Sequence, residues 1–136
     1  MTDLSGKELP RGIIDGAKKY DDGKPPVVQG NLWYFPLAHR AVATVSYYGA
    51  AKYEVEYADN NFAGLDPNRL VDAEGRHLLD QATELYDPES SLLHAAHKAW
   101  EALAHLNGML SRGIPLRNPE VTESLSDLAA KARRTK

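Results

Sequence analysis

The sequence predicts an all-α fold in which a helical bundle follows an extended N-terminal arm. Apolar residues recur at helical spacing in three stretches, residues 36–53, 66–85 and 87–110, and this spacing is typical of amphipathic helices that share a core. The chain before residue 36 combines Gly, Pro, Lys and Asp without helical periodicity. Such a composition favours turns and extended segments over helices.

The arm, residues 1–36, is predicted to be extended and partly ordered. Its stretch GIIDGAKKYDDGKPPVVQGNLWYFP carries repeated turn residues, and a segment of this length without regular structure is usually functional or disordered. The aromatic run at 32–35 argues against full disorder. Together with Ile13 and Ile14, this run can pin the arm to the body and form one small β-pairing.

Residues 36–53 are predicted to form the first helix. One face of this helix collects apolar and small side chains, which permit close packing against a neighbouring helix. These residues are Leu37, Ala38, Ala41, Val42, Val45 and Gly49. The polar segment that follows, up to residue 64, is interpreted as a connection.

The second helix is predicted to begin at Asp66-Pro67, because Asp caps helix starts and Pro is tolerated in the first turn. Its apolar face consists of Val71, Leu78, Ala82 and Leu85. Glu74 and Gln81 fall inside this apolar sector and His77 lies at its edge, so these polar groups need partners. The opposite face is interpreted as solvated, and it carries Asp72, Arg76, Asp80 and Thr83.

The third helix is predicted to begin in the same way at Asp87-Pro88 and to pack antiparallel to the second. Its apolar stripe consists of Leu92, Ala96, Ala99, Leu103, Leu106 and Leu110. The opposite face carries His94, Lys98, Glu101 and His105, with His97 beside them on the Leu93 and Trp100 flank. The two helices therefore hold most of the histidines of the chain.

The whole chain is expected to be one domain, with the arm at 1–36, a helical core at 37–110, and a weak helix with a basic tail at 111–136. The tail from Lys131 to Lys136 is expected to be solvated or disordered. Three short helices leave apolar flanks uncovered, so the core is expected to be completed by a homodimer or a tetramer.

The composition excludes several classes of protein. The absence of cysteine rules out disulfides, thiolate zinc sites and cysteine nucleophiles. The net charge of -3 gives no argument for nucleic-acid binding. No stretch resembles a signal peptide or a membrane span, so the protein is expected to be cytoplasmic, with no membrane and no nucleic acid among its partners.

Two pairs of residues suggest a metal site, because side chains at i and i+3 project from neighbouring turns of one helix. The pairs are Glu74 with His77 and His94 with His97, and imidazole with carboxylate is a donor set for divalent metals. An acidic set is the alternative, and it comprises Asp72, Asp80, Glu84, Asp87 and Glu101. Taken singly, these residues are also explained as surface histidines, caps and solvated charges.

Lysines and aromatic residues provide weaker signals for a nucleotide. The DDGKPP segment of the arm can bring Lys24 and backbone amides to a phosphate, although a charged flexible arm explains it equally well. It has neither the Walker spacing nor the dinucleotide fingerprint. Aromatic residues at element ends, such as Trp33 and Tyr53, can stack on a base but more often close a core.

Five blocks in order resemble a phage family of dATP/dGTP diphosphohydrolases. They are GAKKYDDGKPP at 16–26, YGAAKY at 48–53, NNF at 60–62, RLVDAEGRHLL at 69–79 and DPESSLLHAAH at 87–97. That family resembles a divergent branch of the MazG-type all-α pyrophosphohydrolases, which carry an E-x-x-E and an E-x-x-D pair on adjacent helices. The resemblance implies a MazG-like bundle.

The resemblance also implies site residues. Glu74, His77, His94 and His97 occupy the positions of the family's metal-binding pairs, with imidazoles at three carboxylate positions. The resemblance therefore implies that nearby carboxylates are recruited, with Asp72, Asp80 and Glu84 as the catalytic candidates and Glu101 as a further carboxylate. The phosphate-binding candidates that follow are Lys24, Lys52, Arg76 and Lys98, and the base-binding candidates are Ile14, Trp33 and Asn61.

The implied reaction converts a purine deoxynucleoside triphosphate, dGTP and by extension dATP, to the monophosphate and pyrophosphate. The implied cofactor is Mg²⁺ or Mn²⁺, with two or three ions per site. The implied setting is the cytoplasm of a phage-infected host, where dGMP is a precursor of 2-aminoadenine DNA. The alternative is a non-catalytic helical module that binds nucleotides or proteins.

Overall fold

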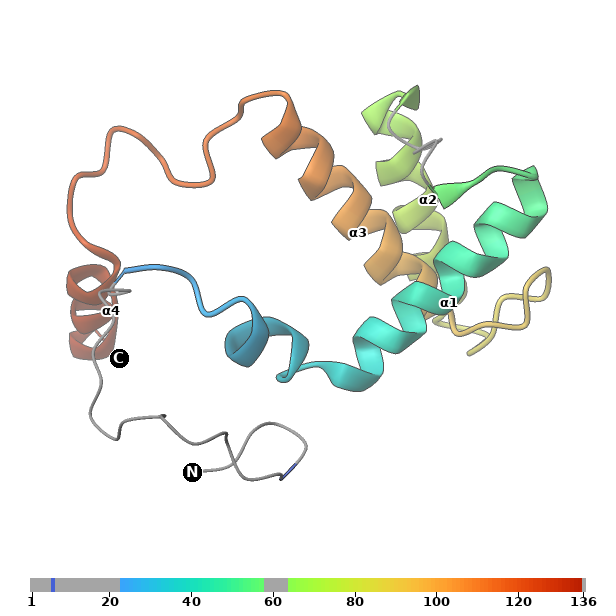
Figure 1. The fold of residues 1–136 in the computed structure, drawn as a ribbon, viewed down its shortest axis with the longest axis horizontal. Coiled ribbons are helices and arrows are strands. Elements are labelled where there is room, and N and C mark those ends of the chain that lie inside the picture. Colours follow the sequence, from blue (N-terminus) through green and yellow to red (C-terminus); the bar gives the residue numbers. More distant parts are fainter. Residues whose placement is uncertain (1–5, 7–22, 58–63, 136) are drawn as a thin grey trace, which may run out of the picture. The chain divides into compact units, whose positions relative to one another are not determined.

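The computed structural model describes residue 6 and residues 23–57 and 64–135 of the chain. Regular structure in these ranges is helical and contains no strand, which confirms the predicted all-α fold (Figure 1). The helices are η1 (Val28–Leu32), α1 (Pro36–Tyr53), α2 (Pro67–Asp80), α3 (His94–Ser111) and α4 (Leu125–Arg134). The chain divides into two units, Met1–Phe35 and Pro36–Lys136, and each is described by itself.

In the first unit, a short π-helical turn, η1, leads into the aromatic run, and residues 33–35 form a turn and a bend rather than the extended structure expected for a β-pairing. Two consecutive prolines, Pro25 and Pro26, precede the turn, and each fixes its own φ at a value compatible with a helix. The turn closes through a hydrogen bond that spans five residues, from the Trp33 amide to the Val28 carbonyl, 2.9 Å long. Ile14, the other expected partner, lies outside the described residues.

Helix α1 buries only the later part of the predicted apolar face, since Leu37 and Ala38 at its start are exposed. Val45 is buried, and Ala41, Val42 and Gly49 on the same side are half-buried. The helix ends where Glu54 adopts a φ of 53°, a left-handed conformation that a regular helix cannot continue through.

Helix α2 begins as predicted, with the Asp66 side chain accepting a 2.9 Å hydrogen bond from the Asn68 amide and with Pro67 in the first turn. It ends at Asp80 rather than near Leu85. Beyond that point the chain makes tighter turns, in which the Ala82 amide donates to the Leu79 carbonyl. Leu85 is therefore not part of the helix.

The predicted start of the third helix was wrong, because α3 begins at His94 and not after Asp87-Pro88. Asp87 instead organises a turn, in which its carboxylate accepts from the Ser90 amide and from the Ser90 hydroxyl, at 3.2 and 2.8 Å. Ser91 then adopts a φ of 63° and redirects the chain. A single β-bridge joins Tyr86 to Leu93 at the base of this turn.

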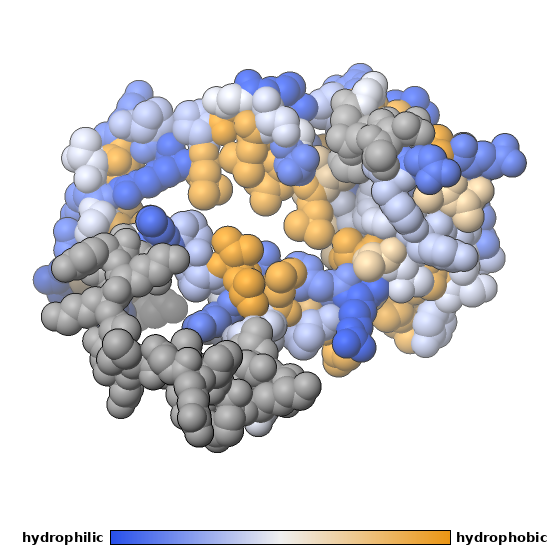
Figure 2. Space-filling view, viewed as in Figure 1, coloured by the Kyte–Doolittle hydropathy of each residue, from blue (hydrophilic) through white to orange (hydrophobic). Residues whose placement is uncertain are grey.

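Helix α3 packs against both α1 and α2 (Figure 1), but with a different face from the predicted one. Leu103, Leu106 and Leu110 of the predicted apolar stripe are exposed. His94, His97 and Ala104 are buried instead. The polar face of α3 is thus an interior face, and apolar side chains remain on the surface (Figure 2).

Helix α4 confirms the predicted C-terminal helix, and Ser124 caps it by accepting from the Asp127 amide at 3.1 Å. The basic residues Lys131 to Arg134 lie in this helix and are exposed, so of the two expected states, solvated or disordered, they adopt the solvated one. An ion pair between Lys131 and Glu123 further ties the helix to its approach segment. Within the described ranges, no helix is both long and apolar enough to cross a membrane.

One side-chain hydrogen bond joins α3 to α1, from the Trp100 indole Nε1 to the Ser46 hydroxyl at 2.8 Å. We expect Ser46→Ala to lower the free energy of unfolding by about 1 kcal/mol, because the bond loses its acceptor. The control is Thr44→Ala, whose hydroxyl bonds only within α1 and should change stability by less than about 0.5 kcal/mol. Urea unfolding measures both, and equal effects would contradict the role given to the bond.

Candidate functional site

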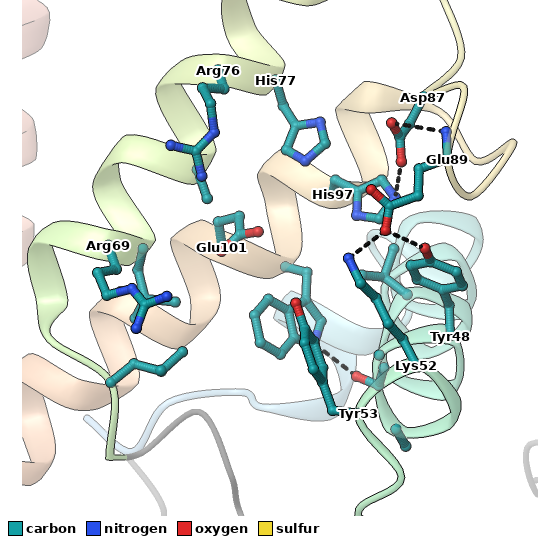
Figure 3. A pocket seen from close by; sticks show the side chains of 18 of the residues that line it. Tyr48, Lys52, Tyr53, Arg69, Arg76, His77, Asp87, Glu89, His97 and Glu101 are labelled. Carbon is teal, nitrogen blue, oxygen red and sulfur yellow. Dashed lines mark hydrogen bonds and ion pairs between the residues drawn. The ribbon is translucent and has the colours of Figure 1, made fainter.

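A pocket of about 760 Å³ lies among α1, α2, α3 and the turn that contains Asp87 and Glu89 (Figure 3). Each of the three helices contributes charged or hydroxyl-bearing side chains to its wall. A volume of this size is in the range of pockets that enclose a cofactor or a nucleotide-sized ligand.

The α2 wall carries charges of alternating sign. Arg69, Asp72, Arg76 and Asp80 all line the pocket, and their spacing of three or four residues places them on one helix face. This is the face interpreted from the sequence as solvated. Arg69 was not among the sequence candidates, although its spacing from Asp72 and Arg76 was visible in the sequence.

The α1 wall is organised around Glu89. The Glu89 carboxylate accepts a 2.9 Å hydrogen bond from the Tyr48 hydroxyl and forms an ion pair with Lys52. The hydrogen bond from Lys52 is the main reason that the pKa of Glu89 lies below its usual value. Lys52, a predicted phosphate ligand, is therefore already paired, and its ammonium also lies 5.2 Å from the Tyr53 ring centroid.

Three imidazoles meet between α2 and α3. His77 Nδ1 lies 2.8 Å from His94 Nδ1, and the His77 ring stacks on the His97 ring with centroids 4.6 Å apart. His94 is 1% and His97 is 7% exposed. Burial lowers the pKa of His77, and the neighbouring imidazoles lower it further. Burial also lowers the pKa of His97.

The turn that contains Asp87 and Ser90 determines which ring nitrogen of His97 carries the proton. The Ser90 hydroxyl donates its proton to Asp87 Oδ2 at 2.8 Å, so Ser90 accepts at its 2.7 Å contact with His97 Nε2. His97 therefore carries its proton on Nε2. Although burial raises the pKa of Asp87, the hydrogen bonds from Ser90 and from the Glu89 and Ser90 amides bring it below its usual value.

A candidate metal centre lies where α2 ends and α3 begins. Asp80, Glu84 and His94 each offer a donor atom, and these atoms lie within 4.8 Å of one another. His94 Nε2 is buried without a hydrogen-bond partner and lies 3.6 Å from Glu84 Oε1. When His94 Nδ1 donates to His77, the Nε2 lone pair faces two carboxylates. A divalent cation satisfies this arrangement of donors, so the residues fit a metal.

The structure brings only some of the predicted site residues together. His77, His94 and His97 are in contact, and Asp80 and Glu84 join His94. Four other candidates line the pocket, namely Lys52, Asp72, Arg76 and Asp80. Four lie outside its wall, namely Glu74, Glu84, His94 and Lys98. Lys24 and Trp33 belong to the other unit, and Ile14 and Asn61 lie outside the described residues.

Glu101 has a more prominent position than the sequence suggested. Its side chain lines the pocket from α3 and is half-buried. Burial raises its pKa to about 7, with Arg76 lowering the value and Glu74 raising it. The sequence indicated Glu101 only as one of several alternative carboxylates, because burial of a polar helix face cannot be read from periodicity.

Comparison with known proteins gives one finding. Residues 15–114 match the family model described as dATP/dGTP diphosphohydrolase, N-terminal. No curated protein and no solved structure matches the chain.

The lowered pKa values of two imidazoles predict a pH dependence of stability. The pKa values of His77 and His97 are lower in the folded state, so the unfolded chain binds more protons below about pH 6.5. In the presence of a metal chelator, the melting temperature should therefore fall as the pH drops from about 7 to below about 6.5. His97→Gln should flatten this slope, whereas His105→Gln, about two turns further along α3, should retain it. Parallel slopes for all three proteins would contradict the assignment.

Proposed function

The chain belongs to the dATP/dGTP diphosphohydrolase N-terminal family, and from this premise we propose that it is a metal-dependent pyrophosphohydrolase of purine deoxynucleoside triphosphates. The proposed reaction converts dGTP or dATP to the monophosphate and pyrophosphate. One observation carries the proposal. The face of α2 that lines the pocket carries Arg69 and Arg76 and also Asp80, and Asp80 belongs to the candidate metal centre with Glu84 and His94.

The proposed metal ligands are Asp80, Glu84 and His94. Carboxylates with an imidazole suit Mn²⁺, and Mg²⁺ would rely more on the carboxylate oxygens. When bound, the ion supplies positive charge that neutralises phosphate oxygens and polarises the α-phosphorus. Asp80 belongs both to this cluster and to the pocket wall, which supports placing the reacting phosphate at this end.

The proposed phosphate ligands are Arg69 and Arg76. Neither guanidinium forms an ion pair with another described residue, and guanidinium groups bind phosphate oxygens through two parallel hydrogen bonds. Lys52 is the weaker candidate, because Glu89 already holds it. Positive charge from the arginines would also stabilise the departing pyrophosphate.

His77 has a proposed role as a hydrogen-bond donor to phosphate. When His94 Nδ1 donates to His77 Nδ1, the neutral His77 ring carries its proton on Nε2. His77 lines the pocket, and its lowered pKa favours the neutral form of the ring. The aromatic rings of Tyr53 and Trp100, also in the wall, are the surfaces proposed for stacking the base.

In an infected cell, the proposed reaction would withdraw purine deoxynucleotides from the pool. With dGTP as substrate, it would supply the dGMP from which a 2-aminoadenine nucleotide is made, the role implied by the resemblance. This biological setting, with a homodimer or tetramer as the active form, is part of the proposal.

Incubating the protein with each dNTP in Mg²⁺ or Mn²⁺ tests the reaction. We expect dGMP or dAMP to appear with an equal amount of pyrophosphate. Release of inorganic phosphate alone would contradict the proposed bond cleavage. Binding of a nucleotide by metal-loaded protein without turnover would favour the non-catalytic binding module.

Ligand substitutions test the metal centre. Glu84→Gln and His94→Gln should each lower kcat/KM by at least about 100-fold and weaken Mn²⁺ binding in calorimetry, because each removes a donor. Glu120→Gln removes an exposed carboxylate beyond residue 114 and serves as the matched control. Unchanged Mn²⁺ affinity in both site variants would show that the ion binds elsewhere.

Substitutions of Arg76 test the phosphate site. Arg76→Gln should raise the KM for dGTP by roughly 10-fold to 100-fold, since a charge-assisted bidentate contact is lost. Arg76→Lys keeps the charge without the planar fork, so its KM should lie between those of wild type and Arg76→Gln. A KM for Arg76→Gln within twofold of wild type would remove Arg76 from the phosphate site.

A further inference from the structure

Glu101 is a carboxyl group in the middle of the pocket that the proposed phosphate and metal sites do not use. It projects from α3 toward the space that Arg76 borders from α2 (Figure 3). Its sequence neighbour Trp100 and the Tyr53 side chain line the same pocket. A carboxyl group beside aromatic surfaces is well placed to meet the polar edge of a stacked base.

The surroundings of Glu101 do not hold its carboxyl group in a single ionisation state near neutral pH. From α2 it faces the opposing charges of Arg76 and Glu74, and Arg69 and Asp72 lie in the same wall. From α1, Lys52 and Tyr53 contribute to the pocket, with Lys52 paired to Glu89. Burial raises the pKa of Glu101 to about 7. Both the carboxylate and the carboxylic acid are therefore present near neutral pH.

These two forms match the two purines. Guanine presents two donors on its Watson–Crick edge, N1–H and the exocyclic N2–H, and a carboxylate accepts from both. Adenine presents an acceptor at N1 and a donor at N6, and a carboxylic acid donates to the first and accepts from the second. A carboxylate facing the adenine N1 lone pair would instead be repelled.

We propose that Glu101 reads the Watson–Crick edge of the substrate base, ionised when the base is guanine and protonated when it is adenine. The inference rests on the proposed function, because it assumes that the pocket holds a purine nucleotide. It explains how one rigid pocket accepts both purines named in the family description without a change of backbone.

The inference makes base preference depend on pH. The ratio of ionised to protonated Glu101 rises about 10-fold per pH unit. The ratio of kcat/KM for dGTP to kcat/KM for dATP should rise in parallel, from dATP preference at lower pH toward dGTP preference at higher pH. Neither base titrates at its Watson–Crick edge in this range, so the nucleotides do not produce such a slope.

Competition in a single reaction measures this ratio. Equimolar dATP and dGTP are incubated with the full chain in Mn²⁺ between pH 6 and 8, and the initial ratio of dGMP to dAMP is recorded. Metal loading, phosphate protonation and the other titrating pocket groups affect both substrates alike and cancel. A dGMP to dAMP ratio that rises by close to 10-fold per pH unit supports the inference, and a flat ratio overturns it.

Two variants separate base reading from a structural role. Glu101→Gln should abolish the slope and favour dATP at every pH, because an amide can donate to N1 and accept from N6–H but cannot accept twice from guanine. Glu74→Gln should keep the slope and raise the dGTP to dATP ratio at each pH, because loss of its charge lowers the pKa of Glu101. A slope that survives in Glu101→Gln overturns the inference.

Nucleotide binding, measured without turnover, separates the role of Glu101 from the proposed reaction. Absence of turnover would overturn the proposed reaction, and the same comparison can then be made with the Kd values of dATP and dGTP in Ca²⁺. A Kd ratio that shifts toward dGTP with rising pH, and that loses this shift in Glu101→Gln, supports the role of Glu101. Equal pH profiles of the two Kd values overturn it.

Discussion

The packing of three imidazoles between α2 and α3, with His94 and His97 buried and His77 half-buried, is the constraint on which the site depends. Imidazoles are costly to bury unless their nitrogens find partners, and here each partner fixes an orientation. His77 and His94 share a hydrogen bond, and the Ser90 hydroxyl engages His97 Nε2. His94 Nε2 remains without a hydrogen bond and lies near Glu84. The packing of two helices thereby presents a lone pair to the Asp80 and Glu84 carboxylates.

The pocket and the metal centre both result from the way in which α2 and α3 are connected and packed. Helix α2 ends at Asp80 and α3 begins at His94, so the connection between them returns the chain and brings Glu84 to His94. The same connection carries Asp87 and Glu89, of which Glu89 contacts Tyr48 and Lys52 on α1. The end of α2, the connection and the start of α3 thus supply the donors Asp80, Glu84 and His94, and the face of α2 supplies charges along the pocket.

The sequence predicted the all-α fold, the start of α2 and the meeting of the two histidine-bearing helices. It did not predict the start of α3, because the Asp87 carboxylate serves equally well to cap a tight turn. It also assigned the wrong inner face to α3, since a helical wheel assumes that the interior is apolar. Where a site is buried, the interior is polar. Arg69 was missed for this reason, and Glu101 was only one of several alternative carboxylates until the structure showed it half-buried in the pocket wall.

Anomalous diffraction from crystals grown with Mn²⁺ and a non-hydrolysable dGTP analogue tests the central claim most directly. We expect a manganese peak at coordination distance, about 2.2 Å, from Asp80, Glu84 and His94 Nε2. We also expect phosphate oxygens on Arg76 and the guanine edge at Glu101. A manganese peak that contacts none of the three donors, or a nucleotide outside this pocket, would contradict the central claim.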